Sequence, residues 1–237
     1  MKIYYVYHSC FAIESENYKL IFDYYKTPDK NIGDFSLNDF LKGDKPIYVF
    51  STHSHGDHFN KNIFDWSGNI TYILSDDILD KRDEKKIHFV KNGDRLNIDN
   101  ISIDVFGSTD LGVSFLIGVD GRRFFYSGDL NWWYWSDDTQ EEYEYMKNFY
   151  FSIIEDIKSY VKEQNIEEIE YLFIPVDPRL EQNYYLGADY FVQNIRVKNI
   201  ICMHFWNDFT VIERLKEVLK DRKINVIDFN KNLTEIV

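Results

Sequence analysis

Three of the chain's six histidines lie within the short stretch THSHGDH. They are His53, His55 and His58, and Asp57 directly precedes the last of them. Imidazole nitrogens and carboxylate oxygens are typical ligands of Zn²⁺ and related divalent cations, and burying them without an ion would cost free energy. On an extended segment, alternate side chains project to the same side. The spacing therefore predicts a metal site, with His53 and His55 at one point and, past a turn at Gly56, Asp57 and His58 at a second point nearby.

The same stretch has a second interpretation, as a polar turn that leads into a short helix. Asp57 or Asn60 could cap such a helix in the segment KNIFDW. Four ligand-type side chains within six positions favour the metal site over the turn.

The elements that must position these residues can be read from the apolar patterns around them. The run PIYVFST directly precedes the histidines and is typical of a buried strand. Other strands are predicted over KIYYVYH, FAIES, YKLIFDYY, NITYILS, RLNIDNISIDVFG, VSFLIGVDGRRFFYSG, YLFIPVD, NIICMHFW and INVIDF. Helices are predicted over TQEEYEYMKNFYFSIIEDIKSYVKEQN, GADYFVQNIRVK and TVIERLKEVLKDR, the first of them beginning near Thr139. The first half of the chain contains consecutive strands, and in the second half strands alternate with helices. This order predicts an α+β fold, with sheets packed together and helices outside.

The composition is that of one globular domain over residues 1–237, without a linker rich in proline, glycine or serine. The net charge of −13 repels polyanions, so nucleic acid is an unfavourable partner. No apolar run approaches the length of a membrane span, and the amino-terminal segment is too polar for a signal peptide. Cys10 and Cys202 lie in apolar runs and are expected to be buried free thiols, so we expect a cytoplasmic protein.

The pattern His-x-His-x-Asp-His resembles that of the metallo-β-lactamase superfamily of metal-dependent hydrolases. Three more segments resemble the superfamily in the right order: LIFDYY, which contains Asp23, FFYSGDLN, which contains Asp129, and IICMHFW, which contains His204. The segment YHSCFAIES is similar to the opening of the branch that includes the ascorbate-phosphate lactonase. The resemblance implies a four-layer αββα sandwich, with metals bound at one edge between the two sheets.

The resemblance also implies two metal sites that share a carboxylate. The implied ligands are His53 and His55 in the first site, Asp57, His58 and His204 in the second site, and Asp129 between the two. Asp57 and Asp129 are the candidate catalytic residues, and Asp57 could help to transfer a proton. Asp23 would support a ligand from outside the set that touches the metal.

The chain departs from the superfamily where another histidine usually serves the first metal. The corresponding turn, VFGSTDLGVSFLI, contains no histidine, and Asp110 is its best ligand by chemistry. Asp110 could equally belong to an Asx or Ser/Thr turn between two strands. With Asp110 the site could hold two ions and would favour Mn²⁺ or Fe²⁺ more than a histidine would; without it, one ion is expected. His8 is either close to the metal pocket or a core histidine, and His88 is expected to have a surface or packing role.

These features predict a hydrolase in which a metal-bound hydroxide cleaves a small ester, lactone or phosphodiester. The cofactor would be one or two divalent metal ions, with zinc the first choice and manganese or iron the alternatives. A non-catalytic or sensory metal-binding protein on the same scaffold is a second interpretation, and a nuclease is a third that the acidic charge disfavours.

The substrate is expected to be a small molecule, and two features bear on whether it is anionic. Arg179 could bind a carboxylate or phosphate, although pairing with one of the many acids is slightly favoured. The aromatic run from Trp132 to Trp135 could form a stacking wall over the substrate or a packing patch. The sequence leaves the oligomeric state undetermined.

Overall fold

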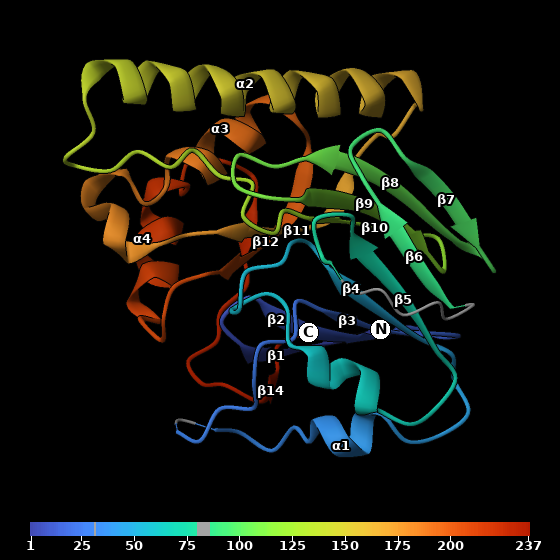
Figure 1. The fold of residues 1–237 in the computed structure, drawn as a ribbon. Coiled ribbons are helices and arrows are strands. Elements are labelled where there is room, and N and C mark those ends of the chain that lie inside the picture. The colour runs from blue at the N-terminus through green and yellow to red at the C-terminus, as the bar shows by residue number, and fades with distance from the viewer. Residues whose placement is uncertain (31, 80–85) are drawn as a thin grey trace.

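The computed structural model describes residues 1–30, 32–79 and 86–237. Its strands form two seven-stranded sheets that pack face to face (Figure 1). The first sheet contains, in spatial order, β14 (Thr234–Glu235), β1 (Lys2–Tyr7), β2 (Cys10–Glu14), β3 (Lys19–Phe22), β4 (Ile47–Ser51), β5 (Ile70–Ser75) and β6 (Ile87–Val90). The second sheet contains β13 (Asn225–Val226), β12 (Val197–Met203), β11 (Ile169–Pro175), β10 (Arg122–Tyr126), β9 (Val113–Val119), β8 (Ile101–Gly107) and β7 (Arg95–Ile98).

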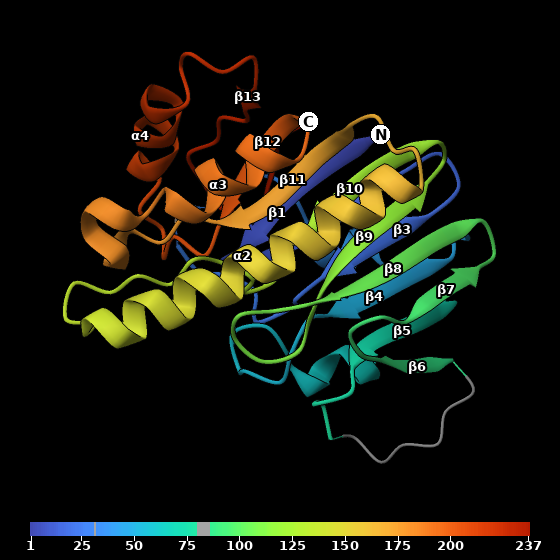
Figure 2. The same ribbon diagram turned by 90° about the horizontal axis from the view of Figure 1, so that it is seen from above.

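Helices cover the outer faces of both sheets, which confirms the predicted α+β sandwich. The helices are α1 (Leu37–Phe40), the 3-10 helix η1 (Lys61–Asp65), α2 (Gln140–Glu163), the 3-10 helix η2 (Pro178–Asn183), α3 (Leu186–Asn194) and α4 (Thr210–Val218). Figure 2 shows α2 running across the second sheet, with α3 beside it. The layer on the first sheet is thin, because α1 and η1 contain only four and five residues.

Strand β4 shows why the segment before the histidines is apolar throughout. All five of its residues are buried, as expected for a strand that is covered on both faces. Ile47 and Val49 belong to the hydrophobic cluster shared with α1 and η1. Tyr48 and Phe50 face the other sheet, where the ring of Phe50 lies 5.4 Å from that of Phe115. This double burial fixes the end of β4, and therefore the start of the histidine stretch.

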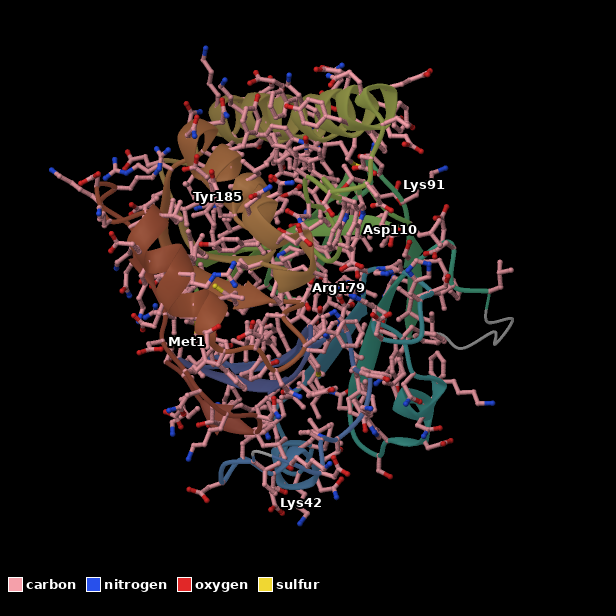
Figure 3. All side chains as sticks on the ribbon, turned by 90° about the vertical axis from the view of Figure 1, so that its left-hand side faces the viewer. Met1, Lys42, Lys91, Asp110, Arg179 and Tyr185 are labelled. Carbon is pink, nitrogen blue, oxygen red and sulfur yellow. The ribbon has the colours of Figure 1, made fainter. Side chains whose placement is uncertain are left out.

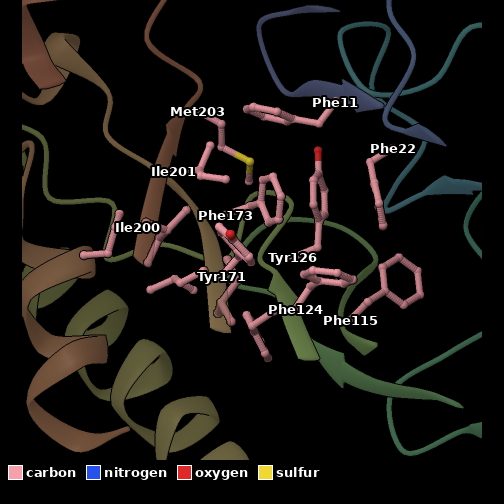
Figure 4. Packing of buried hydrophobic residues seen from close by; sticks show 14 of the residues in the cluster. Phe11, Phe22, Phe115, Phe124, Tyr126, Tyr171, Phe173, Ile200, Ile201 and Met203 are labelled. Carbon is pink, nitrogen blue, oxygen red and sulfur yellow. The ribbon is translucent and has the colours of Figure 1, made fainter. Parts of the chain in front are cut away.

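Aromatic rings fill the space between the two sheets (Figure 4). The ring of Phe22 in the first sheet stacks on Phe50 at 4.7 Å and on Tyr126 of the second sheet at 4.4 Å. Phe173 adds a further ring, 5.6 Å from Tyr126 and 5.0 Å from Phe11. Offset and edge-on ring pairs of this kind stabilise a core beyond their buried area. They hold together the strands whose ends carry the site described below.

Helix α2 begins as predicted, with Thr139 at its amino-terminal cap. The Thr139 hydroxyl accepts a hydrogen bond from the backbone N–H of Glu142, whose carboxylate accepts one from the N–H of Thr139. Thr139→Ala is expected to lower the free energy of unfolding by about 1 kcal/mol, because one backbone donor loses its partner. Urea denaturation measures this difference, and Thr139→Ser should unfold like the wild type. Equal midpoints for the alanine variant and the wild type would show that the cap adds no stability.

Some elements differ from the sequence prediction. Strand β13 occupies only two residues of the predicted run INVIDF, because it pairs at the sheet edge with β12 alone. Strands β6 and β14 and helix α1 were not predicted. Within the described residues, no helix has the length and apolarity needed to cross a membrane. Cys10 and Cys202 are buried and free, as expected.

Candidate metal centre

The candidate site lies where parallel strands of both sheets end. Strands β10, β11 and β12 are parallel neighbours, and Asp129, Asp177 and His204 follow their carboxyl ends. In the first sheet, the parallel neighbours β3 and β4 lead into Asp23 and the stretch 52–58. The carboxyl ends of neighbouring parallel strands meet at one sheet edge, where open α/β sheets commonly bind ligands. Strand order therefore brings together residues that are far apart in the sequence.

Among the residues that the structure describes, eight side chains form two groups in which the potential ligand atoms lie within 4.8 Å of one another. The first group consists of His53, His55, Asp110 and Asp129, and the second of His8, Asp57, His58 and His204. All seven residues predicted as ligands are among them, and His8 is the addition. His88 lies on β6 and belongs to neither group.

Asp129 lies between the two groups. Its Oδ2 atom is 3.7 Å from Nε2 of His53 in the first group and 3.6 Å from Nε2 of His204 in the second. Its Oδ1 atom is 3.1 Å from Nε2 of His58. A carboxylate in this position can contact ions in both groups, which is the arrangement expected for the implied bridging ligand.

Asp110 belongs to the first group, and it and His55 are more exposed than the other two members, His53 and Asp129. Its Oδ2 atom lies 3.2 Å from Nδ1 of His55, and both side chains are more than one-third exposed. The backbone N–H of Asp110 also donates to the hydroxyl of Ser108 at 3.3 Å, as in a polar turn. The two interpretations from the sequence are therefore compatible, because the turn presents the carboxylate to His55.

Oxygen atoms hold the Nδ1 side of three buried histidines. The contacts are His53 Nδ1 to Thr52 Oγ1 at 3.0 Å, His58 Nδ1 to Asp23 Oδ2 at 2.8 Å, and His204 Nδ1 to Asp177 Oδ2 at 2.9 Å. Such partners fix the ring orientation and leave Nε2 available to a metal. Nε2 of all three rings lies within 4 Å of Asp129.

Asp23 has the supporting position that the resemblance implied. Its Oδ1 atom accepts the backbone N–H of Thr52, and its Oδ2 atom accepts the Thr52 hydroxyl, both at 2.8 Å. The carboxylate is fully buried and also contacts His58. Asp23 therefore fixes both the backbone before the histidines and one of their rings.

Asp177 plays the same part for His204, although its role was not predicted from the sequence. It is fully buried, and its hydrogen bonds with His204 and Arg179 outweigh the effect of burial and lower its pKa. The available signal was its place at the end of an apolar strand run, like Asp23. That signal becomes informative only when β11 is known to lie between β10 and β12.

The backbone is strained at the site. His8, Asp23 and His204 have φ angles of 58°, 45° and 61°, in the left-handed region that residues with a side chain rarely adopt. Such strain costs free energy and is concentrated at functional sites. His8 is further tied to the second sheet, because its carbonyl accepts the backbone N–H of His204 at 3.4 Å.

The buried carboxylates and imidazoles of the site shift one another's pKa values. Burial alone would raise the pKa of Asp129, but the charges of His58 and His204 hold that pKa well below its usual value. Burial would lower the pKa of His58, but the carboxylates of Asp129 and Asp23 raise it well above its usual value. Burial lowers the pKa of His8 to about 4, although Asp57 lies 3.3 Å away. A divalent cation would take the place of the proton that these carboxylates stabilise on His58.

The residues fit divalent cations. Nε2 of His53, Nε2 of His58, Oδ1 of Asp129 and both ring nitrogens of His8 are buried without a hydrogen-bond partner in the described part of the chain. Buried polar atoms are normally satisfied, and an unsatisfied one costs roughly 1–3 kcal/mol. Mixed imidazole and carboxylate donors suit borderline and hard divalent ions. The two groups can therefore hold divalent metal ions.

A cavity of about 370 Å³ opens onto both groups. Its walls include Asp57, Asp110, Asp129, His204, Arg179 and three tryptophans. Asp110 and Arg179 both lie on the side of the molecule that Figure 3 shows. A pocket of this size suits a small molecule.

The aromatic run after Asp129 divides between packing against α2 and lining the cavity. Trp132 packs against helix α2, where its ring lies 6.1 Å from that of Tyr143 and 4.9 Å from that of Phe151. Trp133 and Trp135 stack on each other at 6.1 Å and line the cavity. Trp206, which was not predicted to be part of the site, lines the cavity from the segment after β12.

Comparisons with known proteins gave one family match and several structures of similar fold. Residues 2–143 match the model of the beta-lactamase superfamily domain. The structure is similar to Igni18, a metallo hydrolase from Ignicoccus hospitalis, with a TM-score of 0.70 and 16% identity over 99% of this chain and 97% of that one. It is also similar to the metallo-beta-lactamase fold protein YhfI from Bacillus subtilis, with a TM-score of 0.64 and 13% identity over 99% of this chain and 98% of that one.

A third similar structure is that of a hydroxylase and not of a hydrolase. It is CmlA, a diiron beta-hydroxylase from Streptomyces venezuelae, with a TM-score of 0.64 and 11% identity over 97% of this chain and 53% of that one. At these identities the likenesses show the fold alone. A comparison with curated protein sequences gave no significant match.

Proposed function

The chain belongs to the beta-lactamase superfamily, and from this premise we propose that it is a metal-dependent hydrolase of a small ester, lactone or phosphodiester. The observation that carries the proposal is the position of Asp129 between two groups of potential metal ligands. The cavity that opens onto both groups gives a small substrate access to them.

The two groups would each hold one divalent cation. When bound, the cations would supply Lewis acidity and a water of lowered pKa. Zinc suits the histidines, whereas the carboxylate of Asp110 in place of a histidine favours manganese or iron. The choice of metal is thus set mainly in the more exposed first group.

The side chains of the site divide the remaining tasks. His53, His58 and His204 are held by oxygen partners, so their Nε2 atoms stay directed at the site without further reorganisation. Asp57 is the candidate for exchanging a proton with the substrate. Its side chain keeps 26% of its surface exposed and lines the cavity. Trp133 and Trp135 form an aromatic part of the cavity wall.

Hydrolysis of generic substrates tests this proposal. The protein, loaded separately with Zn²⁺, Mn²⁺ and Fe²⁺, is assayed with p-nitrophenyl butyrate, a γ-lactone and bis-p-nitrophenyl phosphate. We expect turnover of at least one substrate and a loss of at least about a hundredfold in Asp57→Ala. Asp65→Ala is the control, because Asp65 is an exposed acid at the end of η1. Bound metal without any turnover would favour the non-catalytic metal-binding alternative.

The role of Asp110 leads to a separate prediction about metal content. Asp110→Ala is expected to reduce the bound metal from two ions per chain to one, because the first group loses its exposed carboxylate. The second group, which does not contain Asp110, keeps its ion. Elemental analysis of protein purified without added metal measures this. An unchanged metal content would remove Asp110 from the ligand set.

A further inference from the structure

Arg179 contributes a fixed positive charge to the cavity. It follows β11 in η2, lines the cavity, and keeps 49% of its side chain exposed. Among the described residues that line the cavity, it is the one lysine or arginine. The carboxylates of Asp57, Asp110 and Asp129 line the same cavity. An anionic substrate would be repelled by these acids unless cations offset them.

One edge of the Arg179 guanidinium is anchored, and the other edge is free. Nε donates to both carboxylate oxygens of Asp177, at 3.0 and 2.9 Å, and Nη2 donates to Oδ2. The backbone N–H of Arg179 also donates to Asp177. Nη1 donates to no protein atom within residues 1–30, 32–79 and 86–237. The anchored group therefore keeps donors that can bind a ligand.

Two indole rings hold the plane of the guanidinium. Its central carbon lies 5.6 Å from the ring centroid of Trp135 and 5.0 Å from that of Trp206. Cation–π contacts at these distances are favourable and orient the group. With Asp177 they restrict the motion of an otherwise flexible side chain, which lowers the entropy lost when an anion binds.

A purely structural ion pair would need none of these features. Arg122 provides the comparison, because it pairs with Glu170 through Nη1 at a similar exposure of 42% and lies outside the cavity. The pairing of Arg179 with Asp177 confirms the interpretation that the sequence slightly favoured. The position of Arg179 beside the metal groups gives it a further role.

We propose that Arg179 is the specificity-determining residue, and that it binds a carboxylate or phosphate group carried by the substrate. The inference rests on the proposed function, because it names the class of molecule that the hydrolase accepts: a small organic anion. A planar guanidinium donates two parallel hydrogen bonds to either group. The cavity volume of about 370 Å³ limits the rest of the molecule to a small apolar or aromatic part against Trp133 and Trp135.

Three matched esters test the proposal. They are p-nitrophenyl butyrate, mono-p-nitrophenyl succinate and p-nitrophenyl 3-phosphonopropanoate, which share a leaving group and differ at the far end of the acyl chain. Wild-type protein should prefer one or both anionic esters, and the relative rates of the succinate and the phosphonate distinguish carboxylate from phosphate recognition. In Arg179→Gln the ratio of kcat/KM for the preferred anion over the neutral ester should fall at least tenfold, mainly through KM.

Two further variants separate recognition from stability. Arg179→Lys keeps a positive charge that can pair with Asp177, but it lacks the parallel N–H donors of the guanidinium. Its ratio of kcat/KM for the preferred anionic ester over the neutral ester should fall at least threefold. Arg122→Gln removes a comparable surface ion pair and should leave the ratio unchanged. Metal content is measured for each variant, because Asp177 also holds His204.

A binding measurement keeps this test independent of turnover. Butyrate and butyramide are titrated into the metal-loaded protein, with indole fluorescence as the signal, because Trp135 and Trp206 flank Arg179. Butyrate should bind more tightly than butyramide. The ratio of the Kd of butyramide to the Kd of butyrate should fall at least tenfold in Arg179→Gln. If no ester is hydrolysed but this difference is seen, the hydrolase proposal fails and anion binding stands. If the ratio and the binding difference are both unchanged in Arg179→Gln, the role of Arg179 is wrong.

Discussion

Asp129→Asn is expected to lose at least about a thousandfold of the hydrolytic rate and at least one bound ion per chain. The carboxylate of Asp129 lies within 4 Å of His53, His58 and His204, so its charge acts on both groups. Asparagine keeps the size but loses the negative charge and one acceptor oxygen. A loss of roughly 4 kcal/mol of transition-state stabilisation corresponds to this factor. The measurements are kcat/KM on the best substrate and metal content by elemental analysis.

The control for Asp129→Asn is Asp65→Asn, which changes the net charge equally at an exposed position. It should keep both ions and full activity. Two ions bound in Asp129→Asn at wild-type affinity would show that this carboxylate does not bridge them. Loss of the folded state, seen by circular dichroism, would instead assign Asp129 a role in folding.

Gly112→Ala is expected to destabilise the protein by about 3 kcal/mol or more and to release the ion of the first group. Gly112 has a φ angle of 71° and lies against the backbone of the histidine stretch. An added Cβ would lie 2.0 Å from the carbonyl oxygen of Thr52 and 2.7 Å from Cβ of His53. Left-handed strain and steric overlap both add to the cost. Urea denaturation and metal analysis measure the two effects.

Gly121→Ala is the matched control for Gly112→Ala. Gly121 has a similar φ angle of 75°, but no atom lies within 4 Å of the position of an added Cβ. It should cost only about 1 kcal/mol and leave the metal content unchanged. Equal destabilisation of the two variants would mean that backbone strain alone accounts for the loss, and that Gly112 does not set the position of His53.

The sequence predicted the interior strands well, because their side chains alternate or are apolar throughout. The pattern of β4 is clear since both of its faces are covered. Edge strands were predicted less well. β6 is partly exposed and mixes polar with apolar residues, and β13 has only two residues. A strand with one neighbour needs no strong apolar pattern, so its signal in the sequence is weak.

The candidate site was predicted where its signal is local or follows a known order of motifs. His53, His55, Asp57 and His58 are neighbours in the sequence, and Asp129 and His204 follow recognisable strands. Asp177 was missed because its part depends on β11 lying between β10 and β12, and a sequence does not show strand order.

His8 and Trp206 were uncertain or missed for a related reason. Both have left-handed φ angles, of 58° and 52°, and each follows a strand. Neither residue is glycine, which is the residue type that favours positive φ angles, so the residue type gives no indication of this backbone conformation. Their rings lie 4.2 Å apart because the two sheets are packed together. Contacts of this kind depend on the tertiary structure.

Anomalous X-ray diffraction from crystals grown with Zn²⁺ or Mn²⁺ tests the central claim most directly. Data collected above and below the absorption edge of the metal locate each ion without reference to activity. We predict two peaks, one within each ligand group, with the carboxylate of Asp129 in contact with both ions. The absence of any peak within reach of His58, Asp129 and His204 at saturating metal would contradict the metal centre itself.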